Sequence, residues 1–398
     1  MSSIWMRRHR KLLTWTTGSL VVLLVGAVFA GYTMVRHLNG NITQANIRGL
    51  LGRQPADLHP QAENILVLGS DTRLGLPGAT AADLGTDQSD TMMLIHIPAN
   101  RQWAEVMSIP RDSWVPIPSC EMGDGQMSSP TQFKINEAYA IGNLHGNHTA
   151  LGAACSVKTL EQDTGIYIDH FVVMSFIGFE KMVAALGGVE ECNPIPLTNP
   201  HSGIVLSAGR HWLTPVEALA YVRAREDIGD GSDLERIARQ QALMSALTAR
   251  AKSKLLDPLA IYRFLDAVTS SLAIDSQLGG VTGLYNLERS LRGIPASRIA
   301  LFTLPTIPRA EVVPSDTANV LWTEPEDNQI FASFRDDVPA SSSLFPPAAP
   351  QPAAAPQPAA ALGRPGKFGV SPSESLGQPG GTPLNLPGRT ASQSICVS

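Results

Sequence analysis

The feature that most constrains this chain is an uncharged, apolar run near its N-terminus. Residues 12–35 contain no Asp, Glu, Lys or Arg, and as a helix they would span about 36 Å, enough to cross a hydrocarbon core of roughly 30 Å. Four basic residues precede the run: Arg7, Arg8, Arg10 and Lys11. Because basic flanks stay in the cytoplasm, we expect a single-pass protein of the cell membrane, with a cytoplasmic segment over 1–11, a transmembrane helix over 12–35 and the following domain outside the cell. A cleaved signal peptide is the alternative, although its apolar region usually covers only about 7–15 residues.

The other end of the chain has a different bias. Residues 339–398 hold 12 of the 30 prolines and four charged side chains, with repeated Pro-Ala-Ala and Pro-Gly units. Such a composition cannot bury enough apolar surface to offset the entropy of ordering, so it predicts a disordered, polyproline-like tail that acts as a passive spacer. The stretch between the two ends, roughly 300 residues, is long enough for one large domain.

The pattern of apolar runs predicts an α/β fold. Short strand-like runs occur at 64–69, 91–97, 103–109, 168–174 and 299–304, and helical patterns at 136–142, 150–163, 175–186, 214–221 and 233–253. Capping boxes begin at Thr214 and Ser232, and the glycine pair Gly187-Gly188 ends the third helix. Irregular alternation of strands and helices favours a mixed β-sheet with helices on both faces. We expect a linker over 36–60, a main domain over 61–253 and an extension over 254–338 packed on it.

Polar residues follow or precede three of the predicted strands. Asp71 and Arg73 follow the first strand, Asp90 precedes the second, and Arg111 follows the third. In open α/β sheets, ligands are held at strand ends. Each residue could instead serve a turn or a helix cap, but three such clusters on neighbouring strands favour a shared site.

Two more arginine clusters lie further along the chain. Arg223 and Arg225 are two residues apart, so they share a face only in extended chain, and we expect the preceding helix to end near Tyr221. Arg236, Arg239 and Gln240 share one face of the next helix. A solvated helix face with Arg–Glu pairs is the alternative interpretation of that last cluster.

These residues together indicate phosphate chemistry. Arginine forks bind phosphate bidentately, and carboxylates beside phosphate oxygens are a usual setting for Mg²⁺. The chain contains no GxSxG, GxxxxGK[ST], GxGxxG or HExxH motif. The sequence therefore favours phosphoryl transfer by positioning and charge stabilisation, without a covalent enzyme intermediate. A net charge of −5 and a pI near 6.0 argue against a nucleic-acid partner.

With these pieces in order, the chain resembles the LytR-CpsA-Psr (LCP) family, particularly its actinobacterial members. The resemblance rests on an ordered set of segments: NILVLGSDTR, SDTMML, SIPRDSWVPIP, KINEAYAIG, IDHFVVMSFIGFEKMVAALGGV, LTPVEALAYVRAR and SDLERIARQQ. It implies an α-β-α fold and an enzyme that transfers a glycopolymer, such as arabinogalactan, from a polyprenyl-pyrophosphate carrier to peptidoglycan. The link would be a phosphodiester to a muramic-acid hydroxyl, and Mg²⁺ or Mn²⁺ would assist.

The resemblance also implies roles for individual residues. Asp71 and Asp90 correspond to the metal-side acids, and Asp90 and Arg111 to the catalytic pair. The implied substrate-binding residues are Arg73, Arg111, Arg223, Arg225, Arg236, Arg239 and Gln240. Many members carry an arginine where this chain has Gln88, which removes one phosphate contact. The lipid of the family lies in an apolar tunnel, and its candidate lining here, equally consistent with core packing, is Val172, Met174, Phe176, Phe179, Met182 and Val183.

Two other functions use the same features. A Mg²⁺-dependent polyprenyl-pyrophosphate pyrophosphatase would need the same residues with water as the acceptor. A non-enzymatic envelope-binding or regulatory protein is the third hypothesis, although a cytoplasmic segment over 1–11 is too short for a DNA-binding domain.

An extracellular location permits disulfides among the four cysteines. We expect a bridge between Cys120 and Cys155 with Cys192 and Cys396 free, while other pairings stay open. His96 and His170 are expected to be satisfied structural histidines, and His145 and His148 to be exposed loop residues rather than metal ligands.

Overall fold

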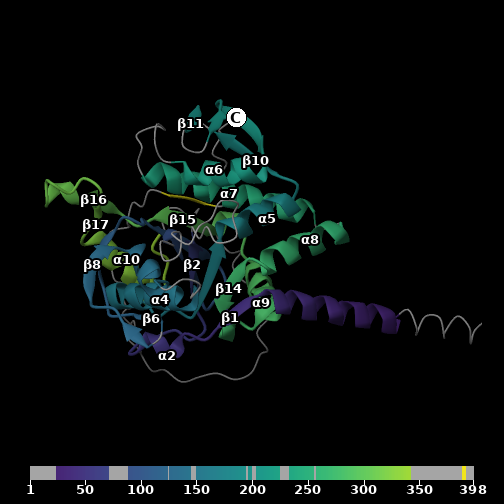
Figure 1. The fold of residues 1–398 in the computed structure, drawn as a ribbon, viewed down its shortest axis with the longest axis horizontal. Helices are drawn as coiled ribbons and strands as arrows, with labels where there is room; N and C mark the ends of the chain where they lie inside the picture. Colours follow the sequence, from purple (N-terminus) through teal and green to yellow (C-terminus); the bar gives the residue numbers. More distant parts are fainter. Residues whose placement is uncertain are drawn as a thin grey trace, which may run out of the picture.

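The computed structural model describes residues 24–70, 88–123, 125–144, 149–193, 196–199, 203–224, 233–254, 257–341 and 388–390. Its centre is an eight-stranded sheet in the order β1-β14-β9-β2-β3-β4-β15-β18 (Figure 1). The strands are β1 (Thr43–Ala45), β14 (Leu272–Asp275), β9 (His170–Ser175), β2 (Glu63–Ser70), β3 (Ser89–Ile97), β4 (Ala104–Ile109), β15 (Ile299–Thr303) and β18 (Gly388–Thr390). Parallel and antiparallel pairs both occur, so the predicted mixed sheet is confirmed.

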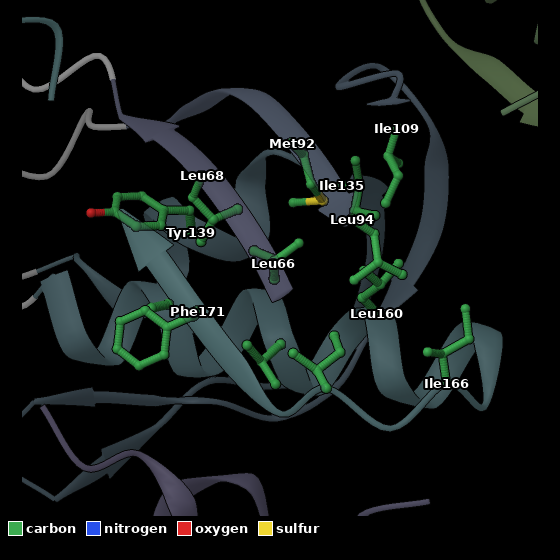
Figure 2. Close-up of a cluster of buried hydrophobic side chains, with 14 of the residues drawn as sticks. Leu66, Leu68, Met92, Leu94, Ile109, Ile135, Tyr139, Leu160, Ile166 and Phe171 are labelled. Atoms are coloured by element: carbon green, nitrogen blue, oxygen red, sulfur yellow. The ribbon is translucent and has the colours of Figure 1, made fainter. Parts of the chain in front are cut away.

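Helices cover both faces of this sheet, as expected (Figure 1). One face packs against α2 (Arg48–Leu51), α3 (Glu137–Gly142), α4 (Thr149–Thr164) and α10 (Glu326–Arg335). Their shared core is shown in Figure 2, where Leu66 and Leu68 of β2 and Met92 and Leu94 of β3 point into it. These residues alternate along each strand because successive side chains of a strand point to opposite faces.

The opposite face carries a second apolar core. It is built from α5 (Phe176–Ala185), α6 (Pro215–Arg223) and α7 (Asp233–Ser253) together with short hairpins. The hairpin strands are β10 (Val189–Asn193) with β13 (Gly209–Leu213), and β11 (Leu197–Asn199) with β12 (Ile204–Leu206). Of the lipid-tunnel candidates, Met182 and Val183 are members of this core, and Met174 and Phe179 pack against it.

Three further hairpins flank the first face. They pair β5 (Trp114–Ile117) with β8 (Thr131–Lys134), β6 (Glu121–Gly123) with β7 (Gln126–Met127), and β16 (Thr306–Pro308) with β17 (Val320–Trp322). Cys120, beside β6, forms a disulfide with Cys155 of α4 across a Cα–Cα distance of 5.4 Å, which confirms the expected bridge. Cys192 of β10 takes part in another disulfide, so the expectation that Cys192 stays free is wrong.

The region 254–338 does more than pack on the preceding domain. It contributes β14 and β15 to the central sheet, together with α8 (Pro258–Thr269), α9 (Gly280–Leu291) and α10. Ala340 and Ser341 are buried beside Glu105 of β4, and residues 388–390 form the edge strand β18. For these residues the expectation of a disordered tail is wrong, because backbone pairing and a buried carboxylate fix them. The rest of 342–398 lies outside the described residues.

The N-terminal helix is described from residue 24 to residue 41, and the first half of the expected membrane span, 12–23, lies outside the described residues. Within the described part of the chain, no helix combines the length and hydropathy needed to cross a membrane. The helix is fastened to the domain by polar contacts. His37 and Asn41 both reach Asp266 Oδ1 of α8 at 2.9 Å.

The two predicted structural histidines are satisfied. His96 is fully buried and makes hydrogen bonds to Asn64 Oδ1 at 2.7 Å and to Asp337 Oδ1 at 3.0 Å. Burial is the main cause that lowers its pKa. His170 Nδ1 lies 2.9 Å from Asp275 Oδ2, whereas His145 and His148 lie outside the described residues.

Candidate active site

Two of the predicted strand-end residues, Asp90 and Arg111, meet at one edge of the sheet. β3 runs antiparallel to β2 and to β4, so the end of β2, the start of β3 and the end of β4 coincide. Met92 is paired with Ile109, and extending this ladder by two residues places Asp90 opposite Arg111. Arg111 Nη1 donates a hydrogen bond to Asp90 Oδ1, and the two side chains are only 14% and 15% exposed.

A second ion pair supports Arg111 from its other side. Its Nε lies 3.5 Å from Asp112 Oδ2, while Lys134 Nζ donates to Asp112 Oδ1 at 2.7 Å. Two cations and two anions therefore alternate over a short distance. Sequence reasoning did not assign Lys134. The available signal was its place at the start of the KINEAYAIG segment. In the structure Lys134 pairs with Trp114 of β5, three residues after Arg111.

Gln88 occupies the position where many family members carry an arginine, and it belongs to a hydrogen-bonded chain. Its Nε2 donates to Glu137 Oε2 at 2.8 Å, and its Oε1 accepts from Asn136 Nδ2 at 3.0 Å. Since the Glu137 carboxylate can only accept, it fixes the orientation of both amides. Asn136 also donates from its backbone N to Arg111 O at 3.3 Å. The chain of contacts therefore braces the backbone that carries Arg111.

Gln240 approaches the same strand from the other face of the sheet. Its Nε2 donates to Thr91 Oγ1 at 3.2 Å and lies 3.5 Å from Val222 O near the end of α6. Thr91 faces this side because it alternates with Asp90 along β3. A Cβ on Gly69 would lie 3.0 Å from Thr91 Cβ, so glycine at the end of β2 leaves room for this contact.

Arg239 is buried and structural in its contacts. It is 8% exposed, and its Nη2 donates to Ala224 O at 2.6 Å, which ties α7 to the residue that follows α6. Its neighbour Gln240 thereby reaches β3 with little freedom. A substrate-binding role for Arg239 stays a prediction.

The prediction that Arg223 lies in extended chain is wrong. α6 continues two residues past Tyr221 and ends at Arg223, because fully buried Tyr221 anchors its last turn and Ala224 N bonds to Ala220 O. The Arg223 guanidinium stacks over the Phe176 ring, 4.8 Å from its centroid. Phe176 directly follows β9, whose Ser175 pairs with the last residue of β2, so Arg223 lies at the same edge.

Several predicted site residues cannot be placed. Asp71, Arg73 and Arg225 lie outside the described residues, as does the side chain of Arg236. The described residues contain no group of three or more His, Cys, Asp or Glu side chains arranged to hold a metal. Among the described residues, the site therefore consists of Asp90, Arg111, Asp112 and Lys134. Gln88, Asn136 and Gln240 brace it.

The chain is thus an α/β protein with an arginine-centred site at the sheet edge where β2 and β4 end and β3 begins. The LytR_cpsA_psr family model matches residues 36–329, and the chain belongs to this family. It is 32% identical over 317 residues to the cell wall biosynthesis protein LcpA of Corynebacterium glutamicum, covering 72% of this chain and 58% of that one. It is 30% identical over 283 residues to TagU, a polyisoprenyl-teichoic acid–peptidoglycan teichoic acid transferase of Halalkalibacterium halodurans, covering 69% of this chain and 82% of that one. The chain spans less than two thirds of the corynebacterial relatives, 61% of LcpB and 58% of LcpA.

Solved structures show the same fold. An LCP enzyme from Actinomyces oris matches with a TM-score of 0.52 at 23% identity, over 74% of this chain and 95% of that one. A Streptococcus agalactiae protein matches with a TM-score of 0.54 at 21% identity, over 69% of this chain and 87% of that one. The central mixed sheet and its two helical layers are therefore those of the family.

Proposed function

We propose that this protein is a Mg²⁺-assisted phosphotransferase that attaches a glycopolymer from a polyprenyl-pyrophosphate carrier to peptidoglycan through a phosphodiester. The observation that carries the proposal is the Asp90–Arg111 pair at the edge where β2, β3 and β4 end or begin. The transferase named among the relatives, TagU, attaches teichoic acid to peptidoglycan, which supports the same class of reaction here.

Arg111 and Lys134 are placed to hold a pyrophosphate. Their positive charges are balanced by Asp90 and Asp112. The oxygens of a bound pyrophosphate would replace some of these carboxylate contacts. Fixed cations aimed at a transferring phosphoryl group stabilise the charge that develops in the transition state. Arg223, at the same edge beside Phe176, would extend the anion-binding surface toward the end of β2.

The proposed reaction breaks one bond and forms one bond. A hydroxyl oxygen of the acceptor glycan attacks the phosphorus that carries the glycopolymer, and the bridging P–O bond of the pyrophosphate breaks. Polyprenyl monophosphate leaves, and the proton of the attacking hydroxyl passes to solvent water. The Arg111 contact to Asp90 holds the guanidinium at the strand edge while the phosphoryl group moves.

The oxygen donors at this edge fit a divalent cation such as Mg²⁺ or Mn²⁺. Asp90 supplies a carboxylate, and Asn136 Oδ1 is buried without a hydrogen-bond partner among the described residues. Hard cations take such carboxylate and amide oxygens. Asp90, together with Asp71, would hold the ion, which would neutralise pyrophosphate charge when bound.

We also propose the membrane arrangement that such a substrate requires. Residues 12–35 would anchor the chain in the cell membrane, with residues 1–11 in the cytoplasm and the site outside, where peptidoglycan lies. The contacts of His37 and Asn41 with Asp266 would then fix the domain relative to its anchor.

The test uses the full chain in detergent micelles with Mg²⁺, a short-chain polyprenyl-pyrophosphate glycan and peptidoglycan fragments. Mass spectrometry would search for a phosphate-linked glycan on the fragments. We expect the product with the unmodified chain and with a control variant, Arg292→Ala, whose arginine pairs on the surface with Glu288 of α9. Asp90→Ala and Arg111→Ala should both abolish it. Free glycosyl phosphate without linked product would indicate a pyrophosphatase, and lipid binding without turnover would indicate a binding or regulatory protein.

A further inference from the structure

The backbone that carries Arg111 and Asp112 is held from several directions. Within the turn, Pro110 O accepts from Ser113 N at 3.1 Å and from Ser113 Oγ at 2.6 Å. The segment that follows β8 supplies two further donors. They are Asn136 N, which reaches Arg111 O at 3.3 Å, and Ile135 N, which reaches Ser113 O at 2.8 Å. The remaining carbonyl of this turn, that of Asp112, takes its donor from much further along the chain.

Val320, the first residue of β17, supplies that donor. Its N–H donates to Asp112 O at 3.1 Å, and it forms an isolated parallel bridge with Ser113. β17 also packs against β5, the strand that follows the turn, and it lies next to β8, the partner of β5 (Figure 1). The β16–β17 hairpin therefore closes a side of the turn that the neighbouring strands leave open.

Arg309, which directly follows β16, stacks this hairpin on the start of β5. Its guanidinium carbon lies 4.2 Å from the ring centroid of Trp114, and a cation over an indole face is attracted by the ring. Arg309 also forms an ion pair with Asp316, and the two side chains are only 20% and 13% exposed. Partly buried pairs are screened by salt less than exposed ones, so this contact can hold the hairpin in place.

The loop between β16 and β17 fixes the orientation of the Asp316 carboxylate. Asn319 Nδ2 donates to both Asp316 oxygens at 2.7 Å, and Arg309 N donates to Asn319 O at 2.8 Å. Asn319 immediately precedes Val320, so the network that holds Arg309 also fixes the amide that reaches the turn. The ion pair and the backbone contact therefore act as one unit.

Trp114 connects this unit to the second cation of the site. It is paired with Lys134 across the β5–β8 hairpin, and its ring centroid lies 5.3 Å from that of Phe133. Lys134 Nζ in turn donates to Asp112 at 2.7 Å. A displacement of Trp114 would therefore carry Lys134 with it and change the spacing of the cations at the site.

We propose that Arg309 is a positioning residue for the site. It seats the β16–β17 hairpin on Trp114, and the hairpin holds the 110–113 turn. The spacing of Arg111 and Lys134, and with it their affinity for an anion, then depends on a residue outside that pair. The inference rests on the proposed function, because the anion is the pyrophosphate of that reaction.

Calorimetric titration of the full chain in detergent micelles with inorganic pyrophosphate and Mg²⁺ tests this role, at a temperature where circular dichroism shows each variant folded. At metal sites, loss of a residue that orients a ligand residue costs roughly 10–100-fold, and we expect Arg309→Met to weaken binding about tenfold. Arg309→Lys should bind more tightly than Arg309→Met, because lysine keeps a cation on the indole face.

The matched control is Arg292→Met, which breaks the surface pair with Glu288 of α9 and should bind like the unmodified chain. Equal affinity of Arg309→Met and this control would overturn the proposal.

Hydrogen exchange measured by mass spectrometry separates this inference from the proposed function. In Arg309→Met we expect peptides over 110–117 and 319–323 to exchange at least about fivefold faster than in the unmodified chain, with those of α9 unchanged. If the unmodified chain binds no pyrophosphate, the proposed function fails, and this exchange still decides whether Arg309 holds the turn. Unchanged exchange over 110–117 would overturn the inference even where pyrophosphate binds. If Arg309→Met fails to fold, Asp316→Asn removes the same ion pair and gives the same comparison.

Discussion

Arg111 donates a hydrogen bond to Asp90 where β4 has just ended and β3 is beginning. Twenty-one positions separate the two residues in sequence, and the antiparallel ladder alone makes them neighbours. A guanidinium and a carboxylate held this way, each about 15% exposed, form a rigid charged pair at the site edge.

Replacing Arg111 by lysine should remove most activity while the fold is retained. Lysine keeps the charge but loses the planar fork that can contact Asp90, Asp112 and a phosphate together. Removal of one preorganised electrostatic donor costs about 10²–10³ in rate, so we expect kcat/KM to fall at least ~10²-fold. Product formation followed by mass spectrometry measures this, with circular dichroism as the folding control. Activity close to that of the unmodified chain would refute a phosphate-binding role for Arg111.

Lys134→Met should weaken substrate binding more than turnover. Asp112 forms ion pairs with both Arg111 and Lys134. Without Lys134, only Arg111 balances the Asp112 carboxylate, so Arg111 is drawn toward Asp112 and away from the phosphate. We expect KM for the lipid substrate to rise about tenfold, corresponding to ~1.4 kcal/mol, with a smaller change in kcat. The matched control is Arg292→Ala, which removes a surface cation remote from the site. An unchanged KM would show that Lys134 acts only on stability.

Gln88→Glu should be more harmful than Gln88→Arg. Glutamate would place a second carboxylate against Glu137, where Gln88 now donates at 2.8 Å, whereas arginine can still donate to that carboxylate. We expect Gln88→Glu to lower the free energy of unfolding by about 1–3 kcal/mol, the cost of leaving a partly buried acceptor unpaired. Thermal unfolding of both variants at pH 7.5 gives the comparison. Equal melting temperatures would contradict the orientation assigned to the amides.

Thr91→Val and Gln240→Ala should be non-additive. Each removes the 3.2 Å hydrogen bond that links β3 to α7, and such a bond contributes about 0.5–1.5 kcal/mol. We expect the double variant to be destabilised less than the sum of the single variants, as is usual for residues in direct contact. Denaturant unfolding of the four proteins in the cycle measures the coupling. Strict additivity would indicate that the contact contributes nothing.

Asp163→Asn should stabilise the fold above neutral pH. Burial raises the pKa of Asp163 from its ordinary value of 3.8 to about 7, and its Oδ2 has no hydrogen-bond partner among the described residues. The folded state therefore binds the proton more tightly than the unfolded state, so stability is lost as the pH rises from about 4 to about 7. Asparagine does not titrate, so we expect the variant to melt at least about 2 °C higher at pH 8. The advantage should vanish near pH 4, and a pH-independent difference would contradict this origin.

Local signals in the sequence were sufficient for most elements. The helix after Thr214 begins where its capping box predicts, with Thr214 N donating to Glu217 Oε2 at 2.9 Å and Glu217 N to Thr214 Oγ1 at 3.3 Å. The strands at 64–69, 91–97 and 299–304 correspond to β2, β3 and β15. The end of α6 was misplaced, because the packing of Tyr221 against the second core, not the local pattern, decides where that helix stops.

By itself, the sequence determined the strand and helix periodicity, the caps, and the placement of Asp90 and Arg111 at strand ends. These depend on interactions within a few residues or on a simple alternation of apolar side chains. Only the tertiary structure decided that Lys134 shares Asp112 with Arg111, that Gln88 is joined to Asn136 and Glu137, and that Gly388–Thr390 returns to the sheet. Those contacts join residues far apart along the chain, and strand order and register, which no local pattern encodes, bring them together.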